Sequence, residues 1–200
     1  MSKSGLFIVL EGVDGSGKST HARLLCEELG KRKFDVLQTD EPSQGIIGRL
    51  IREHAEQGDR RMPTEVEALL FAADRFEHTR NVIEPALAKG QVVVSDRYLH
   101  SSLAYQGAGG LSVDWIRDLN RFALKPDLGI LLDLNIEKVF QRMGHRRKTV
   151  FEEKIFLQKV RDLYLQFHER GELVKVDADR PIEEVKKDII LLVEKALHNP

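Results

Sequence analysis

The sequence predicts an α/β protein in which one parallel β-sheet is flanked by helices on both faces. Short apolar runs rich in Val, Ile and Leu alternate with longer segments of helical period along the whole chain. Most of these runs are apolar throughout, as expected of strands that are buried on both faces of a parallel sheet. The alternation favours a three-layer sandwich with right-handed crossovers.

The expected elements follow in strand–helix order from the N-terminus. An apolar run at 6–10 is followed by a glycine-rich stretch and by a helical pattern at 18–33. A weaker strand at 35–39 precedes two helical segments, 45–57 and 64–89.

The second half of the chain continues the alternation. A valine-rich strand at 91–95 leads to a pair of helices across 99–124, which end at a Lys-Pro-Asp turn because the position before proline disfavours the helix. The remaining expected elements are the strand 128–133, helices 136–143 and 151–170, a weaker strand 173–176 and a helix 181–198.

Composition limits the domain organisation and the partners. A chain of 200 residues is most simply one domain, 1–200, with a substantial core. Its 31 basic and 32 acidic residues give no overall field that favours nucleic acid or a membrane, so neither is an expected partner. The single cysteine, Cys26, suits a reducing cytosol, and the run 6–10 is too short for a signal segment or a membrane span. We therefore expect a cytoplasmic protein.

The stretch GVDGSGKS at residues 12–19 matches the P-loop pattern G-x-x-x-x-G-K-[ST] in full, between a strand and a helix. Its glycines allow backbone N–H groups to converge on an anion, and the following helix directs its positive end toward the same place. Lys18 is expected at the β- and γ-phosphates of ATP, and the Ser19 hydroxyl on Mg²⁺. The predicted ATP-binding residues here are Gly12, Val13, Asp14, Gly15, Ser16, Gly17, Lys18, Ser19 and Thr20.

A P-loop alone does not separate a phosphotransferase from a GTPase-type switch. Guanine-specific switches usually carry N-K-x-D after a strand, and the nearest match here, Lys125-Pro126-Asp127, precedes one. A kinase needs a second anion site, and Asp96 and Arg97 offer it at the carboxyl end of the third strand. Asp96 suits the hydration shell of Mg²⁺, and Arg97 suits bidentate binding of a phosphate. Without the P-loop, the two residues would fit a surface ion pair equally well.

Five longer stretches identify a family. LEGVDGSGKST, TDEPS, LLFAADRFEH, SDRYLHSSLAYQG and KPDLGILLDL resemble thymidylate kinases, with the same order and spacing. The resemblance covers roughly the whole chain, and SDRYLHSSLAYQG is its most specific part. It implies a P-loop nucleoside monophosphate kinase that transfers a phosphoryl group from ATP to dTMP, giving dTDP for dTTP biosynthesis. It also implies Mg²⁺ as cofactor, Ser19 and Asp96 as the metal residues, and a homodimer built on the long helices.

The resemblance assigns the thymine base to four residues. Phe71 would stack on the ring, and Arg75, one turn later on the same helix face, would hydrogen-bond its O4 atom. Ser102 and Gln106 would meet the edge of the base, since an amide offers both a donor and an acceptor. The alternative for an isolated Phe71–Arg75 pair is a core phenylalanine and a surface arginine.

Other residues are assigned to the phosphate and the sugar. Arg97 would bind the acceptor phosphate and act with Lys18 in catalysis. Tyr105 would lie where a ribose 2′-OH collides, with an ordinary helix aromatic as the alternative. Asp14 would accept a hydrogen bond from the 3′-OH. Glu41 would lie near the same hydroxyl and Mg²⁺, with a plain loop glutamate as the alternative.

The chain departs from the family pattern at two places. Bacterial members often carry an arginine just before the Glu-Pro pair, where this chain has Asp40, and Arg49 and Arg52 are the candidates to compensate. The P-loop also lacks an arginine, and such chains take the catalytic arginine from a lid.

The basic stretch GHRRK at 144–148 lies where that short lid, about 142–151, is expected. Arg147 and Arg146 are the catalytic candidates, and a solvated basic turn is the alternative. Arg142 is a candidate to stack on the adenine of ATP, or else a surface arginine. Two other functions stay open: a kinase that acts on dUMP or a nucleoside, and a nucleotide-binding switch or regulatory ATPase, which the Phe71–Arg75 pair and SSLAYQG disfavour.

Overall fold

The computed structural model describes residues 5–56, 62–143 and 150–198. Its five strands form one parallel sheet in the order β2-β3-β1-β4-β5. All five predicted strands are confirmed to within one residue at each end. Their bounds are Leu6–Glu11 for β1, Val36–Asp40 for β2, Val92–Asp96 for β3, Leu128–Asp133 for β4 and Val174–Asp177 for β5.

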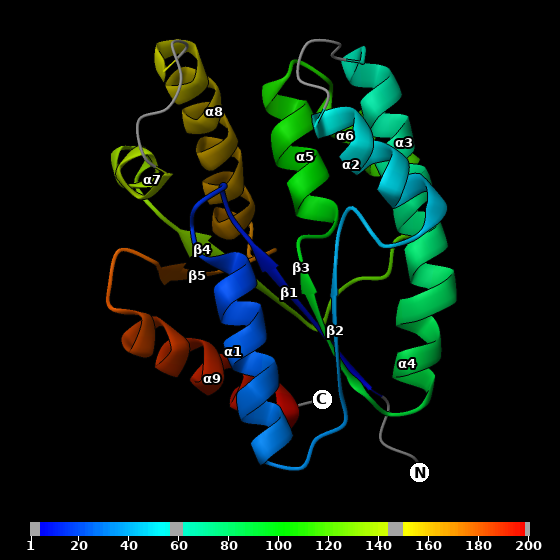
Figure 1. Ribbon diagram of the computed structural model, residues 1–200, viewed down its shortest axis with the longest axis vertical. Helices are drawn as coiled ribbons and strands as arrows, with labels where there is room; N and C mark the ends of the chain where they lie inside the picture. Colours follow the sequence, from blue (N-terminus) through cyan, green and yellow to red (C-terminus); the bar gives the residue numbers. More distant parts are fainter. Residues whose placement is uncertain (1–4, 57–61, 144–149, 199–200) are drawn as a thin grey trace.

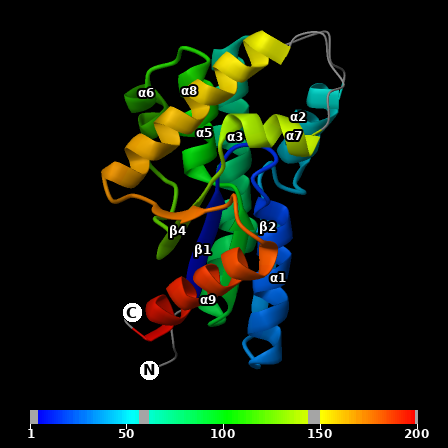
Figure 2. The ribbon, with the colours of Figure 1, turned by 90° about the vertical axis from the view of Figure 1, so that its left-hand side faces the viewer.

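Helices cover both faces of this sheet, which confirms the predicted three-layer α/β sandwich (Figures 1 and 2). Helices α1 and α9 pack on one face, η1 and α4 lie on the other, and α5 and α8 lie side by side near the carboxyl ends of the strands. The helical bounds are Lys18–Lys31 for α1, Ile46–Glu56 for α2, Thr64–His78 for α3, Thr79–Ile83 for η1, Glu84–Ala88 for α4, Leu99–Ala108 for α5, Val113–Leu119 for α6, Ile136–Met143 for α7, Val150–Glu169 for α8 and Ile182–His198 for α9.

Strand β1 contributes to an apolar cluster on each side of the sheet. Ile8 and Leu10 lie in the larger cluster with side chains of α1 and α9. Phe7 and Val9 point the other way, into a smaller cluster with side chains of η1 and α4. Burial on both faces explains why this run is apolar at successive positions.

The expected single helix over 64–89 is wrong in one respect. The segment is helical throughout, but residues Thr79–Ile83 form a π-helical turn between α3 and α4. Pro85 follows in the first turn of α4. A proline has no N–H to donate and its ring collides with the carbonyl group four residues earlier, and a widened turn accommodates both effects.

The parallel arrangement brings the carboxyl ends of β1, β2 and β3 to one edge of the sheet, where Glu11, Asp40 and Asp96 end their strands. The loops that follow these residues carry the candidate functional groups. Within the three described ranges, none of the helices combines the length and the apolar content that a membrane span needs.

Candidate active site

The P-loop depends on glycine for its shape. Gly12, Gly15 and Gly17 have φ angles of 141°, 77° and 97°. A Cβ atom on Gly12 would lie 2.6 Å from the carbonyl oxygen of Leu132, so no larger residue fits there. Gly17 is the N-cap residue of α1, so the loop lies next to the free N–H groups that make this end of the helix positive. This geometry suits a bound phosphate chain.

The side chain of Lys18 is buried against the backbone of this loop. Its ammonium group donates to the carbonyl oxygen of Val13 at 3.0 Å, and only 5 % of the residue is exposed. Burial lowers the pKa of Lys18 to about 8, with a further contribution from Arg97, although Asp14 and Asp96 act in the opposite direction. A bound polyanion would favour the charged form of this lysine.

Ser19, the last residue of the P-loop pattern, lies next to Asp96 at the end of β3. The Ser19 hydroxyl donates to one carboxylate oxygen of Asp96, while the other oxygen, Oδ1, is buried without a hydrogen-bond partner. Mg²⁺ prefers oxygen ligands and is commonly held by one or two protein groups together with phosphates and water. The pair therefore fits a magnesium ion. In the part of the chain that the structure describes, no cluster of three or more His, Cys, Asp or Glu side chains offers another metal site.

Arg97 holds an unusual backbone conformation next to the P-loop. Its φ angle of 71° lies in the left-handed region, which non-glycine residues rarely adopt. The guanidinium group forms an ion pair with Asp14 and lies 5.2 Å from the centre of the Tyr105 ring. The Tyr105 hydroxyl donates to Asp14 at 3.2 Å and accepts from the Asp14 N–H at 3.1 Å. The structure thus brings together three residues that were predicted to bind the phosphate and sugar of dTMP.

Asp14, Arg97 and Tyr105 shift one another's pKa values. Burial alone would raise the pKa of Asp14, but Arg97 and Lys18 outweigh it and hold the pKa below its usual value. Burial raises the pKa of Tyr105 to about 12. The pKa of Arg97 is raised despite burial, because Tyr105 and Asp14 favour its charge. At neutral pH the cluster is therefore a carboxylate, a guanidinium and a neutral phenol.

Two of the residues predicted to meet the base, Arg75 of α3 and Ser102 of α5, contact each other between these helices. Arg75 is 1 % exposed, and its Nη2 atom donates to the Ser102 hydroxyl at 2.9 Å and to the Tyr98 carbonyl at 3.1 Å. Gln106, also buried, has a side-chain oxygen without a hydrogen-bond partner. Phe71 lies half-buried one turn before Arg75. The alternative of a surface position for Arg75 is wrong.

The carboxylate of Glu41 is buried and directed at α3. It forms an ion pair with Arg75 at 2.7 Å and contacts Nδ1 of His78 at 3.1 Å. His78 also contacts the Thr39 hydroxyl at 2.6 Å through Nε2. The one signal for His78 in the sequence is its position three residues after Arg75, which places both on one helix face. The expected approach of Glu41 to a sugar hydroxyl and Mg²⁺ stays a prediction.

The two departures from the family pattern have different outcomes. Of the two candidates to compensate for Asp40, Arg52 forms an ion pair with it at 2.7 Å, while Arg49 donates to the Gln44 carbonyl at 2.8 Å.

Of the arginines expected at the lid and the adenine, the structure describes only Arg142, which is exposed and donates to the Ala178 carbonyl at 2.9 Å. Arg146 and Arg147 lie outside the described residues.

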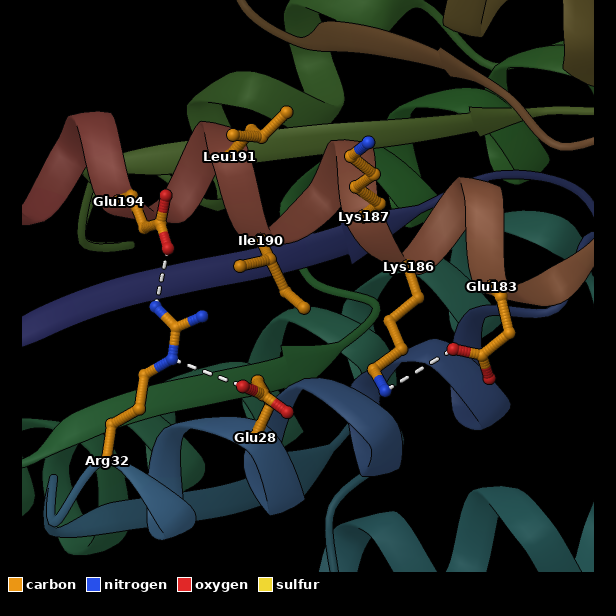
Figure 3. A pocket seen from close by; sticks show the side chains of 8 residues that line it. All are labelled: Glu28, Arg32, Glu183, Lys186, Lys187, Ile190, Leu191 and Glu194. Carbon is orange, nitrogen blue, oxygen red and sulfur yellow. Dashed lines mark hydrogen bonds and ion pairs between the residues drawn. The ribbon is translucent and has the colours of Figure 1, made fainter.

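A surface hollow of about 420 Å³ lies elsewhere, between α1 and α9 (Figure 3). One ion pair crosses it, from Arg32 at the end of α1 to Glu194 of α9 at 2.5 Å, and Arg32 also pairs with Glu28 of its own helix at 3.2 Å. None of its lining residues belongs to the P-loop or to the cluster of Asp14, Arg97 and Tyr105. The candidate active site is therefore at the carboxyl ends of β1 and β3 and not in this hollow.

Comparison with known proteins agrees with this geometry. The family profile described as thymidylate kinase matches residues 10–189. The chain belongs to the thymidylate kinase family. Proteins described as probable thymidylate kinases include those of Thermococcus gammatolerans, 47 % identical, Pyrococcus abyssi, 49 % identical, and Methanocaldococcus jannaschii, 42 % identical. Each alignment covers 96 % of this chain and 98 % of the relative. Membership of the thymidylate kinase family makes the protein a nucleoside monophosphate kinase, a transferase.

Proposed function

We propose that this protein transfers the γ-phosphoryl group of ATP to dTMP, giving ADP and dTDP. The observation that carries the proposal is the pairing of two anion sites at one edge of the sheet, in a chain of the thymidylate kinase family. One is the P-loop with Lys18, and the other is Arg97. A kinase needs both, whereas a nucleotide-dependent switch needs only the first.

The chemistry requires positioning and charge neutralisation more than a strong base, because the attacking oxygen already belongs to an anionic phosphate. Lys18 would neutralise the donor phosphates, and Arg97 would hold the acceptor phosphate. Ser19 and Asp96 would hold Mg²⁺, which when bound neutralises charge on the phosphates. Arg147 or Arg146 would complete the arrangement from a lid and, together with lid closure, exclude water.

Recognition of dTMP would use the two clusters around Arg97 and Arg75. Asp14 would accept from the 3′-OH of the sugar, and the Tyr105 ring would exclude a ribose 2′-OH. Phe71, Arg75, Ser102 and Gln106 would surround the thymine. The unpartnered Gln106 oxygen supports this assignment, because a buried acceptor without a donor is costly unless a ligand supplies one.

The wider setting is also part of the proposal. We infer one cytoplasmic kinase domain over residues 1–200 that works as a homodimer, with Arg142 against the adenine of ATP. The arginine that often precedes the Glu-Pro pair is replaced here by the Asp40–Arg52 ion pair, which leaves Arg52 close to the same loop.

The test is ADP production from Mg–ATP with and without dTMP. A thymidylate kinase consumes ATP in strong dependence on dTMP, whereas a regulatory ATPase is indifferent to it. Parallel reactions with dUMP, dCMP and thymidine separate the alternative acceptors. Lys18→Ala should lower kcat by about 10²–10³-fold if the P-loop lysine stabilises the transferred charge. Equal ATP consumption without dTMP would refute the proposal.

A further inference from the structure

Glu11, the last residue of β1, carries a buried carboxylate that the proposed reaction does not use. Its exposure is 0 %. Oε1 accepts from the backbone N–H groups of Tyr98 at 3.0 Å and Ser101 at 3.2 Å. Oε2 accepts from the hydroxyl groups of Ser101 at 2.7 Å and Tyr164 at 3.0 Å. A buried charge is costly unless it is fully hydrogen-bonded, and here both oxygens are occupied by donors.

These four hydrogen bonds join three elements. Tyr98 is the N-cap residue of α5, and its own side chain makes no capping hydrogen bond. Glu11 supplies that cap from the neighbouring strand, and a carboxylate is well placed near the positive end of a helix. Tyr164 belongs to α8, which packs along α5 (Figure 1). One carboxylate therefore fixes the start of α5 relative to both β1 and α8.

The same carboxylate is connected to Arg97. The Ser101 hydroxyl gives its proton to Glu11, so a lone pair of its oxygen is free to accept from Nη1 of Arg97, at 3.3 Å. The hydrogen bonds run in one direction, from guanidinium to hydroxyl to carboxylate, and each strengthens the next. Arg97 has a φ angle of 71°, a conformation that persists only where the surroundings hold it.

We propose that Glu11 is a positioning residue, which fixes the Arg97 guanidinium through the Ser101 hydroxyl. The inference rests on the proposed function, in which Arg97 binds the acceptor phosphate. It goes beyond that function because Glu11 itself touches neither substrate. Its role is to keep the Arg97 guanidinium in place before dTMP binds. The binding of dTMP then does not have to offset the conformational entropy that Arg97 would lose on being ordered.

Glu11→Gln separates positioning from simple electrostatics by the sign of its effect. A carboxylate near two polyanion sites repels both substrates, so an electrostatic role alone predicts a lower KM for ATP and for dTMP in the variant. Glutamine keeps the shape but replaces one acceptor oxygen by a donor. Either the two hydroxyl groups or the two backbone N–H groups must then lose their acceptor. If Glu11 positions Arg97, the KM for dTMP rises by about ten- to a hundred-fold, while the KM for ATP changes by less than about threefold.

Ser101→Ala is the matched variant, because it removes the link to Arg97 and leaves the other donors to Glu11 in place. It should give the same selective rise in the KM for dTMP. The double variant should be little worse than either single one, since both changes break one chain. Thermal unfolding of each variant shows whether it is folded, and if Glu11→Gln does not fold, Ser101→Ala decides.

Two results would overturn the inference. One is a lower or unchanged KM for dTMP in both folded variants while the wild-type protein phosphorylates dTMP normally. The other is additivity of the two substitutions, which would mean that they act independently. Absence of dTMP turnover in the wild-type protein is a different failure, because it overturns the proposed function and this role of Glu11 together.

Discussion

Lys18 must carry a positive charge in a place that disfavours it. Burial and Arg97 lower the pKa of the free protein's Lys18 to about 8, so a fraction of the lysine is neutral under mildly alkaline conditions. A bound triphosphate raises that pKa, because opposite charge favours the protonated form. Binding ATP above about pH 8 therefore requires proton uptake.

We predict that affinity for Mg–ATP is constant below the free pKa and falls as pH rises above it, until the pKa of the bound state is reached. Calorimetric titration at about pH 7 and about pH 9, in buffers of different ionisation enthalpy, measures both the affinity and the proton uptake. Uptake should be larger at the higher pH. Lys18→Arg is the control, because arginine does not titrate in this range. Proton uptake that is the same in both proteins would assign it to another group.

Tyr105 combines two roles that substitution can separate. Its hydroxyl is bonded to Asp14 and its ring lies against Arg97. Tyr105→Ala should reduce the preference for dTMP over its ribonucleotide by about tenfold, because the bulk that excludes a 2′-OH is removed. Tyr105→Phe keeps the ring and should keep the preference. The measurement is the ratio of kcat/KM for the two acceptors, and a ratio that Tyr105→Ala leaves unchanged would show that the ring does not exclude ribose.

At the scale of the elements, local signals were sufficient for the strands and for the P-loop. The apolar runs predicted each strand, and the P-loop pattern predicted the glycine conformations and the start of α1. The division of the segment 64–89 was not predicted, because the π-turn depends on how Pro85 is accommodated within a helix that continues. The contacts among Asp14, Arg97 and Tyr105 fit the phosphate and sugar site that the family resemblance implies, which the pattern of the chain alone does not predict.

The connections between elements could not be predicted from the sequence. Glu11 and His78 make their hydrogen bonds to residues that are distant along the chain, and the stretches that contain them do not indicate these partners. The motif around Glu41 likewise does not predict that its carboxylate is buried in contact with Arg75 and His78. Burial and hydrogen-bond partners depend on tertiary structure. A motif therefore predicts which residues lie close together but not which of them form hydrogen bonds or ion pairs with one another.

A second connection, which is partly buried, makes the packing of elements sensitive to acid. Glu172, between α8 and β5, contacts His100 of α5 at 3.0 Å and Arg117 of α6 at 2.8 Å. Burial would raise the pKa of Glu172, but these two partners outweigh it and hold the pKa below the usual 4.5. A lowered pKa in the folded state means that the stabilisation is present above about pH 4.5 and is lost as pH falls through the folded-state pKa.

We predict that Glu172→Gln lowers the stability by about 1 kcal/mol at neutral pH. The difference from the wild-type protein should shrink in acid, where the glutamate also loses its charge. Denaturant unfolding at about pH 7 and about pH 4 measures both values. A loss of stability that is equal at the two pH values would mean that hydrogen-bond geometry, rather than charge, accounts for the contribution.

Large apolar side chains are exposed on α2 and α3, and they support the homodimer that the family resemblance implies. These two helices pack against each other. The α2–α3 surface consists of large apolar side chains that are between 42 % and 71 % exposed, namely Ile46, Leu50, Val66, Leu69 and Phe76. An exposed group of this kind on adjoining helices is typical of an interface between copies. In a twofold interface the same surface of both subunits is buried, so each of these side chains would be covered in both copies.

We predict that the protein is a dimer in solution and that Leu69→Glu makes it a monomer, because the substitution places two like charges in one desolvated interface. Size-exclusion chromatography with light scattering gives the mass of each species directly. Ile182→Glu is the matched control: Ile182 is 54 % exposed, but it lies on α9, which packs with α1 rather than with α2 or α3. It should leave the dimer intact. If the wild-type protein is monomeric at high concentration, or if both variants dissociate equally, the α2–α3 surface is not the dimer interface.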